Sequence, residues 1–179
     1  LWHLESYKEN LEKLAVVVSE SKQDTILLYK PHPKERMQDA AMALEIMRKH
    51  HHKSKLEQEL ATEALLARSD LLSSSFSLAG LDQVFLNRSA QKPLGITAFV
   101  LMSEGLLQWY RNFTKHDGTM PGMEEFAEVV LSQEELKETI VHSKNPDFRG
   151  QRWLNIIEKL PDPTDSPKLI VSHILNELN

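Results

Sequence analysis

The sequence predicts an α/β domain built on a doubly wound parallel sheet, and three observations indicate this fold. Short apolar runs without alternation, such as 24–29 and 93–101, are typical of strands buried on both faces of a sheet. Segments with apolar residues at helical spacing lie between these runs, so that strands and helices alternate along the chain. The length of 179 residues is that of about one domain.

Each element follows from the pattern of its own segment. Apolar residues at helical spacing predict helices over 4–18, 34–49, 56–67, 78–86, 103–112 and 151–160. Short apolar runs predict strands over 24–29, from Leu71 into the serines of 73–77, over 93–101 and over 126–131. The polar stretch 48–55, RKHHHKSK, predicts no element. We therefore expect four strands with helices between them.

Capping signals place the helices of the last third. Ser132 with Glu135 three residues later has the spacing of a capping box and predicts a helix start. The stretch 144–150 breaks the chain before the helix over 151–160. Proline-rich residues 161–167 predict a rigid linker, and Ser166 with Pro167 predicts the start of a final helix. The expected organisation is one domain over 1–160, followed by a linker and C-terminal helix over 161–179.

The composition excludes several classes of protein. Apolar residues make up 41% of the chain and charged residues 26%, as in a folded globular protein. The net charge of −5 disfavours broad nucleic-acid binding. The absence of cysteine excludes disulfides, thiolate catalysis and cysteine-ligated zinc, and it fits the cytoplasm. No run reaches the length of a membrane span, and the opening LWHLESYKEN resembles no signal peptide. The chain begins without Met and enters a helix pattern almost at once, so we expect a piece of a longer chain.

Polar residues follow two of the expected strands at the point where each strand ends. Lys30 and His32 come directly after the first strand, and Pro31 and Pro33 restrict the backbone around the histidine. The second strand ends in the serine-rich stretch 73–77. In open α/β sheets, ligands bind beyond the carboxyl ends of the strands, so both stretches occupy favourable positions.

These residue types suit a phosphate. The helix expected after the serines begins with unpaired N–H groups and a partial positive charge, which favour an anion. Serine hydroxyls add donors, Lys30 adds a point charge, and His32 can donate a hydrogen bond whether neutral or charged. Two other interpretations stay open at this point: the serines are helix caps or a turn, and His32 is a rigid loop residue.

Other candidate residues give weaker signals. His50, His51 and His52 are adjacent and cannot easily converge on one ion, so a solvated loop is the preferred interpretation, and we expect no metal site. Glu104 follows the strand over 93–101 and is a candidate contact for ribose or sugar hydroxyls. Glu124 and Glu125 are candidates for the same role, and solvated carboxylates are the preferred interpretation for this pair. The G-x-S-x-G, P-loop and G-x-G-x-x-G patterns are absent.

Four stretches together resemble the C-terminal half of a glycosyltransferase with the GT-B fold. In chain order they are LLYKPHPKE at 27–35, LARSDLLSSSFS at 66–77, KPLGITAFVLM at 92–102 and GMEEFAEVVLSQEELKETI at 122–140. The pattern is similar to bacterial enzymes of surface polysaccharide biosynthesis, namely sialyltransferases and polysialyltransferases with an H-P motif and a serine motif, and capsule and teichoic-acid polymerases. UDP-N-acetylglucosamine 2-epimerases share the fold.

The resemblance implies a Rossmann-like domain that binds a nucleotide sugar. It assigns His32 as catalytic, through contact with the donor phosphate. It implies phosphate-binding roles for the cluster Lys30, Ser73, Ser74, Ser75 and Ser77. No cofactor is implied beyond the nucleotide-sugar substrate.

The resemblance also implies partners and a location. The sugar acceptor is a glycan or a lipid-linked molecule, and the general base belongs to an N-terminal domain that is absent from this chain. The full-length enzyme is expected in the cytoplasm, with a possible peripheral position at the inner face of the membrane. The chain departs from the family where RKHHHKSK replaces an expected strand.

Two alternatives to the transferase remain open from the sequence. An enzyme like the UDP-N-acetylglucosamine 2-epimerases needs acid and base carboxylates at the sugar. A non-catalytic α/β interaction module follows if the serine turn has only a structural role.

Overall fold

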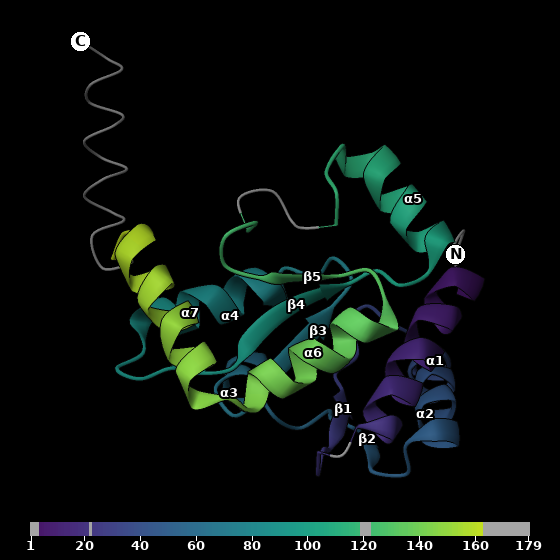
Figure 1. Ribbon diagram of the computed structural model, residues 1–179. Helices are drawn as coiled ribbons and strands as arrows, with labels where there is room; N and C mark the ends of the chain where they lie inside the picture. The colour runs from purple at the N-terminus through teal and green to yellow at the C-terminus, as the bar shows by residue number, and fades with distance from the viewer. Residues whose placement is uncertain (1–3, 22, 119–122, 163–179) are drawn as a thin grey trace.

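The computed structural model describes residues 4–21, 23–118 and 123–162 (Figure 1). Helices and strands alternate as far as residue 144, as the sequence predicts, and a last helix then follows directly. The helices are α1 (Leu4–Glu20), α2 (Met37–His50), α3 (Thr62–Leu66), α4 (Ala79–Ser89), α5 (Glu104–Thr114), α6 (Gln133–Lys144) and α7 (Pro146–Lys159). The strands are β1 (Leu27–Tyr29), β2 (Ser54–Leu56), β3 (Leu71–Ser74), β4 (Ile96–Val100) and β5 (Glu128–Val130).

The strands form two small parallel sheets. In the first sheet β1 pairs with β2, and Leu27 lies opposite Ser54. The second sheet has the order β3-β4-β5, with Ser74 of β3 opposite Phe99 of β4. Because neighbouring strands run in the same direction, the loops that leave their carboxyl ends meet at one edge of each sheet.

Helices cover both faces of the three-stranded sheet. Every residue of the central strand β4 is buried, and its side chains alternate between the faces. Ala98 and Val100 lie in a core cluster with residues of α1 and α6. Phe99 lies in a second cluster with residues of α4 and α7. Figure 1 shows α6 in front of the sheet and α4 behind it.

Helix α1 packs between α2 and the strands. Leu14, Val17 and Val18 contact the face of β4 and β5. Leu11 and Ala15 contact α2 and β1 in a separate cluster. The apolar positions of α1 therefore form a wide stripe, which is typical of a helix covered by other elements on more than one side.

The stretch expected to lack an element contains β2, and the helix expected over 56–67 is shortened to α3. Ser54 is buried at the start of β2, and its hydroxyl donates to the carbonyl of His51 at 2.7 Å. The Glu57 side chain accepts the N–H groups of Glu59 and Leu60 at 2.9 Å each, which forms a turn where the sequence predicts helix. Local hydrogen bonds of this kind compete with a helix, so periodicity alone misplaces its start. The strand that the family resemblance led us to regard as missing is present.

The predicted capping box is confirmed at α6. The Ser132 hydroxyl accepts the N–H of Glu135 at 3.2 Å, and the Glu135 carboxylate accepts the N–H of Ser132 at 3.1 Å. The predicted break at 144–150 is a single residue, Asn145, whose side chain caps α7 with Pro146 in the first turn. The final helix expected from Ser166 lies outside the described residues.

Among the described residues, no helix combines the length and apolarity needed to cross a membrane.

Candidate functional site

The loop that leaves β1 is held in shape by Glu35. One carboxylate oxygen of Glu35 accepts the backbone N–H of His32 at 3.1 Å, and the other accepts the hydroxyl of Tyr29 at 2.8 Å. The N–H of Glu35 in turn donates to the His32 carbonyl at 2.8 Å. The loop is therefore closed on itself and attached to the end of β1.

His32 presents one ring nitrogen outward. Its Nδ1 accepts the backbone N–H of Lys34 at 3.1 Å, so the neutral ring carries its proton on Nε2. The residue is exposed, and Nε2 has no hydrogen-bond partner among the described residues. The neutral imidazole can thus donate to an anion without disturbing the loop.

Lys30 lies at the same strand end, but its ammonium group already has a partner. Nζ donates to the carbonyl of Leu60 at 2.7 Å, which ties the end of β1 to the loop after β2. An ammonium group has three donors, so two remain for other contacts. Lys30 therefore holds two loops together and contributes positive charge near His32.

The serines after β3 do not all face the same way. Ser73 lies opposite Ala98 in the sheet and shares the face covered by α1 and α6. Ser74 lies opposite Phe99 and shares the face covered by α4 and α7. Adjacent strand residues point to opposite faces, so these two side chains are separated by the sheet.

Ser75 is used inside the structure. Its hydroxyl donates to the carbonyl of Val100 at 3.2 Å and lies 3.4 Å from the side-chain nitrogen of Asn10. Because its single hydroxyl proton is already donated to Val100, Ser75 stabilises the fold and is not available as a donor to a ligand.

Ser74 and Ser77 keep their hydroxyl protons available. The Ser74 oxygen accepts the N–H of Ser77 at 2.9 Å, and the Ser77 oxygen accepts the N–H of Ala79 at 3.2 Å. A hydroxyl that accepts in this way still has one proton to donate. These bonds occupy some of the backbone N–H groups near the start of α4, which the sequence predicts as donors to an anion. The hydroxyls of Ser74 and Ser77 can donate to the anion in their place.

Helix α1 connects the His32 loop to the serine turn. The hydroxyls of Tyr7 and Tyr29 are 2.6 Å apart, and burial raises the pKa of both phenols. One turn later, Asn10 contacts Ser75. Residues three apart on a helix are neighbours, with roughly 5–6 Å between Cβ atoms. Both strand ends are therefore attached to one short stretch of the same helix.

Asn10 also replaces a missing strand neighbour. Its side-chain nitrogen donates to the Val100 carbonyl at 3.0 Å, and its side-chain oxygen accepts the N–H of Met102 at 2.8 Å. These backbone groups lie at the end of β4 and just after it, beyond the point where β3 ends. The amide of Asn10 satisfies them, and β3 is free to turn away into the serine stretch.

The carboxyl end of β4 carries a second polar cluster. The buried Ser103 hydroxyl donates to Glu9 at 2.7 Å, and Lys13 lies 2.6 Å from the other oxygen of that carboxylate. The bonds from Lys13 and then Ser103 lower the pKa of Glu9. Glu104, the candidate sugar contact, is the exposed first residue of α5 at this strand end.

Sequence reasoning missed the residues that hold the site together. Tyr7, Asn10 and Glu35 were not identified as site residues, and each connects a strand end to a neighbouring segment. The signal for Asn10 was present in the sequence, since an amide lies on the apolar stripe of α1 beside Leu11 and Leu14. A polar residue on a buried face needs partners, and its partners identify the site.

The histidine stretch is more ordered than expected. His51 is buried and its Nε2 lies 3.0 Å from the Thr25 carbonyl, while His50 pairs with Glu12 at 2.9 Å. The expectation of a solvated loop is thus wrong for His51. Groups of residues that could hold a metal are not found in the described part of the chain.

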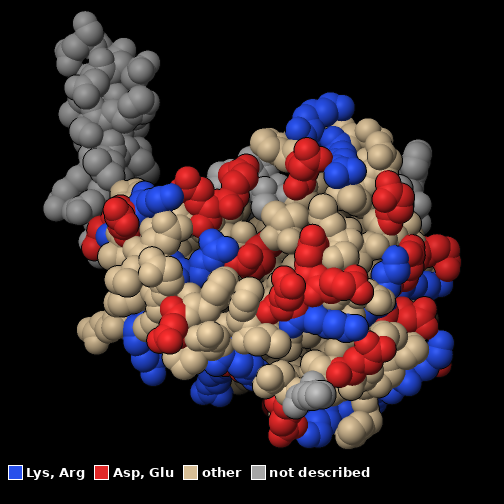
Figure 2. Space-filling view, in the orientation of Figure 1, with Lys and Arg blue, Asp and Glu red and all other residues tan. Residues whose placement is uncertain are grey.

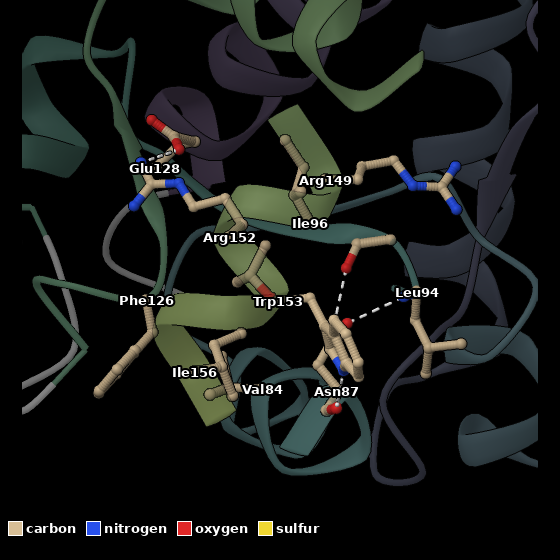
Figure 3. Close-up of a pocket in the computed structure, with 12 residues that line it drawn as sticks. Val84, Asn87, Leu94, Ile96, Phe126, Glu128, Arg149, Arg152, Trp153 and Ile156 are labelled. Carbon is tan, nitrogen blue, oxygen red and sulfur yellow. Dashed lines mark hydrogen bonds and ion pairs between the residues drawn. The ribbon is translucent and has the colours of Figure 1, made fainter. Parts of the chain in front are cut away.

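A small hollow lies at the opposite end of the sheet (Figure 3). It is enclosed by α4, α7 and the start of β4, where Trp153 donates to the Asn87 carbonyl at 3.0 Å and Arg152 pairs with Glu128. Its volume of about 10 Å³ suits at most one water molecule. The hollow is therefore no site for a nucleotide.

Acidic and basic side chains are interspersed over the face shown in Figure 2. Such a distribution differs from the one-sided basic patch of a typical nucleic-acid binder.

Comparison of the chain with family models, curated proteins and solved structures found no significant match in any of the three.

Proposed function

We propose that this chain is the nucleotide-sugar-binding domain of a glycosyltransferase, which moves an activated sugar to a glycan or lipid-linked acceptor. The single observation that carries the proposal is the attachment of two strand-end loops to one turn of α1, through Tyr7 at β1 and Asn10 at β3. In these loops His32, Ser74 and Ser77 each keep a proton that can be donated to a ligand. The stretches KPHP and SSSFS also give the sequence its resemblance to GT-B enzymes.

The strand connections support the same location. We propose that the two sheets belong to one doubly wound, Rossmann-like sheet of order β2-β1-β3-β4-β5. Leu27 of β1 and Leu71 of β3 pack against the same core cluster, which supports their being neighbours. In this order the chain leaves β1 in one direction and β3 in the other, and ligands of doubly wound sheets bind at such a switch point.

The proposed chemistry is stabilisation of the leaving group. When the bond between the sugar and the nucleotide breaks, negative charge develops on the phosphate. Donors that are already in position stabilise this charge without having to reorganise, which lowers the barrier. In the proposal His32 donates from Nε2, Ser74 and Ser77 donate from their hydroxyls, and Lys30 adds positive charge. The general base and the acceptor site lie on another domain.

Calorimetric titration tests the proposal. CMP, CDP, UDP and inorganic pyrophosphate are each added to the protein and to two histidine variants. His32→Ala is expected to weaken binding by about tenfold, which corresponds to the loss of one hydrogen bond to a charged group. His52→Ala is the matched control, because His52 is an exposed histidine far along the chain from the proposed site. Absence of binding at millimolar concentration, or equal binding by the His32→Ala variant, contradicts the proposal and favours an interaction module.

A second assay separates the transferase from an epimerase. The chain is incubated with UDP-N-acetylglucosamine and no acceptor. We expect no turnover, because the acceptor and general base lie outside this domain. Formation of the 2-epimer would favour the epimerase alternative.

A further inference from the structure

An aromatic surface adjoins the serine turn. Phe76 lies between Ser75 and Ser77, and its ring is 5.1 Å from Trp109 and 5.9 Å from Tyr110 of α5, measured between centroids. Trp109 in turn stacks on Phe113 with centroids 5.3 Å apart and an interplanar angle of 6°. The turn that carries the candidate phosphate donors is thus joined to a row of rings. We name Phe76, Trp109 and Phe113 the aromatic row.

The aromatic row is supported from below. Tyr110 is buried with Leu101, Leu106 and Leu107, and burial raises the pKa of its phenol. Its ring is nearly parallel to that of Phe76, with an interplanar angle of 9°. Figure 1 shows α5 standing out from the body of the molecule. The row therefore has a rigid base and an outer side.

Two residues of the aromatic row are exposed to solvent. The exposed fraction of Phe113 is 74%, and that of Phe76 is 40%. Large apolar side chains on a surface are unremarkable when they are scattered, but a contiguous group indicates a binding site. Phe85 offers a comparison, because it is 41% exposed on α4 and belongs to no ring contact found among the described residues.

We infer that the aromatic row binds the planar base of the nucleotide by stacking. This inference rests on the proposed phosphate site. Base stacking on aromatic side chains tolerates any base, since each has a flat π face. The position of Phe76 inside the serine turn brings the row next to a phosphate held by Ser74 and Ser77. The row thus explains how an exposed site without a deep pocket distinguishes a nucleotide from a free phosphate.

The position of the aromatic row beside the serine turn indicates which molecule binds to it. A base linked to the phosphate is delivered to the rings by the same molecule that fills the donor site. A lipid surface is the competing occupant for exposed aromatic residues. We take the nucleotide as the occupant, because the hydroxyls of Ser74 and Ser77 lie in the same turn as Phe76 and can donate to the phosphate that is linked to the base.

Titration of the full chain with CDP, UDP and inorganic pyrophosphate tests the inference. Phe76→Ala and Phe113→Ala are each expected to weaken binding of CDP and UDP by about tenfold, the size of one lost stacking contact. Neither change is expected to alter binding of pyrophosphate, which has no base. Phe85→Ala is the control and is expected to leave all three affinities unchanged.

Proton NMR of the bound nucleotide supplies a second readout. Stacking places the base within the ring current, so the H5 and H6 signals of the pyrimidine are expected to move upfield, and less so with Phe113→Ala. A merely structural role of the rings would not produce this difference.

The outcomes separate the inference from the proposed function. If pyrophosphate binds as tightly as CDP and UDP, or if both aromatic variants bind the nucleotides normally, the inference is wrong and the phosphate site stands. If neither pyrophosphate nor nucleotide binds, both are wrong. If the protein binds vesicles of phosphatidylserine through Phe113 and ignores nucleotides, the row is a membrane contact and the inference is overturned.

Discussion

Asn10 shows how a single side chain positions the candidate site. It lies on the apolar stripe of α1, and its amide pairs with the Val100 carbonyl and the Met102 N–H. It also contacts Ser75 at the start of the serine turn. A buried amide costs free energy unless its groups are paired, and here the pairing ends a strand and orients a loop.

Replacement of Asn10 by alanine leaves the buried N–H of Met102 without its partner and removes one of the two side-chain donors to the Val100 carbonyl, the other being Ser75. We expect a loss of about 2 kcal/mol in the free energy of unfolding, the cost of unsatisfied buried polar groups. Urea denaturation followed by circular dichroism measures it. Asn112→Ala on the exposed part of α5 is the control and is expected to change stability by less than about 0.5 kcal/mol. Equal effects of the two changes would show that Asn10 is not a structural link.

Tyr7 makes the fold sensitive to alkaline pH. Burial raises the pKa of its phenol above the ordinary value of 10.0, so the folded state favours the neutral form. The stabilisation is complete below pH 10, and it is lost as pH rises above the pKa of the unfolded chain.

Denaturation curves recorded at pH 8 and at pH 10.5–11 test the role of Tyr7. We expect Tyr7→Phe to be less stable than the parent protein by about 1 kcal/mol at pH 8, because the bond to Tyr29 is lost. The difference in the free energy of unfolding between the two proteins is expected to be smaller at the higher pH, because the parent protein loses the contribution of its neutral Tyr7 phenol there. A difference that stays constant across this range contradicts the assignment.

At the scale of elements, the sequence predicted the presence of helices more accurately than the residues at which they begin and end. The box at Ser132 was predicted because two side chains at fixed spacing determine it. The start of β2 was missed because a strand of three residues shows no periodicity, and its place depends on pairing with distant β1. The Glu57 turn likewise depends on one local hydrogen-bond pattern.

In the candidate site too, the features set by local sequence could be predicted, and those set by contacts between distant residues could not. The positions of His32 and the serines at strand ends follow from local pattern. The opposite facing of Ser73 and Ser74 follows from strand pairing. The contacts of Tyr7 and Asn10 join residues 22 and 90 positions apart, which no local pattern reveals.

Ser132→Ala removes the hydroxyl that caps α6. We expect a loss of about 1 kcal/mol in the free energy of unfolding, the usual effect of a lost N-cap. Thermal denaturation monitored by circular dichroism measures this loss. Glu135→Gln keeps a residue that completes the box and is expected to cost less. If Glu135→Gln is the more destabilising of the two, charge at the helix start matters more than the cap.

At the scale of the whole molecule, α1 attaches the ends of β1 and β3 to one another. The helix packs against both strand groups through Leu11 and Leu14, and its first turns attach the loops after β1 and β3. The hollow at the other end of the sheet has room for at most one water molecule. The proposed site therefore lies where the strands end and α1 begins.

The most direct test of the central claim is a map of amide signals by two-dimensional NMR during titration with inorganic pyrophosphate. The account predicts that the largest shifts fall in two separate stretches, 30–36 and 73–81, and that both change with the same dissociation constant. Shifts confined to one stretch, or centred on residues around Trp153, would contradict a shared phosphate site at the ends of β1 and β3.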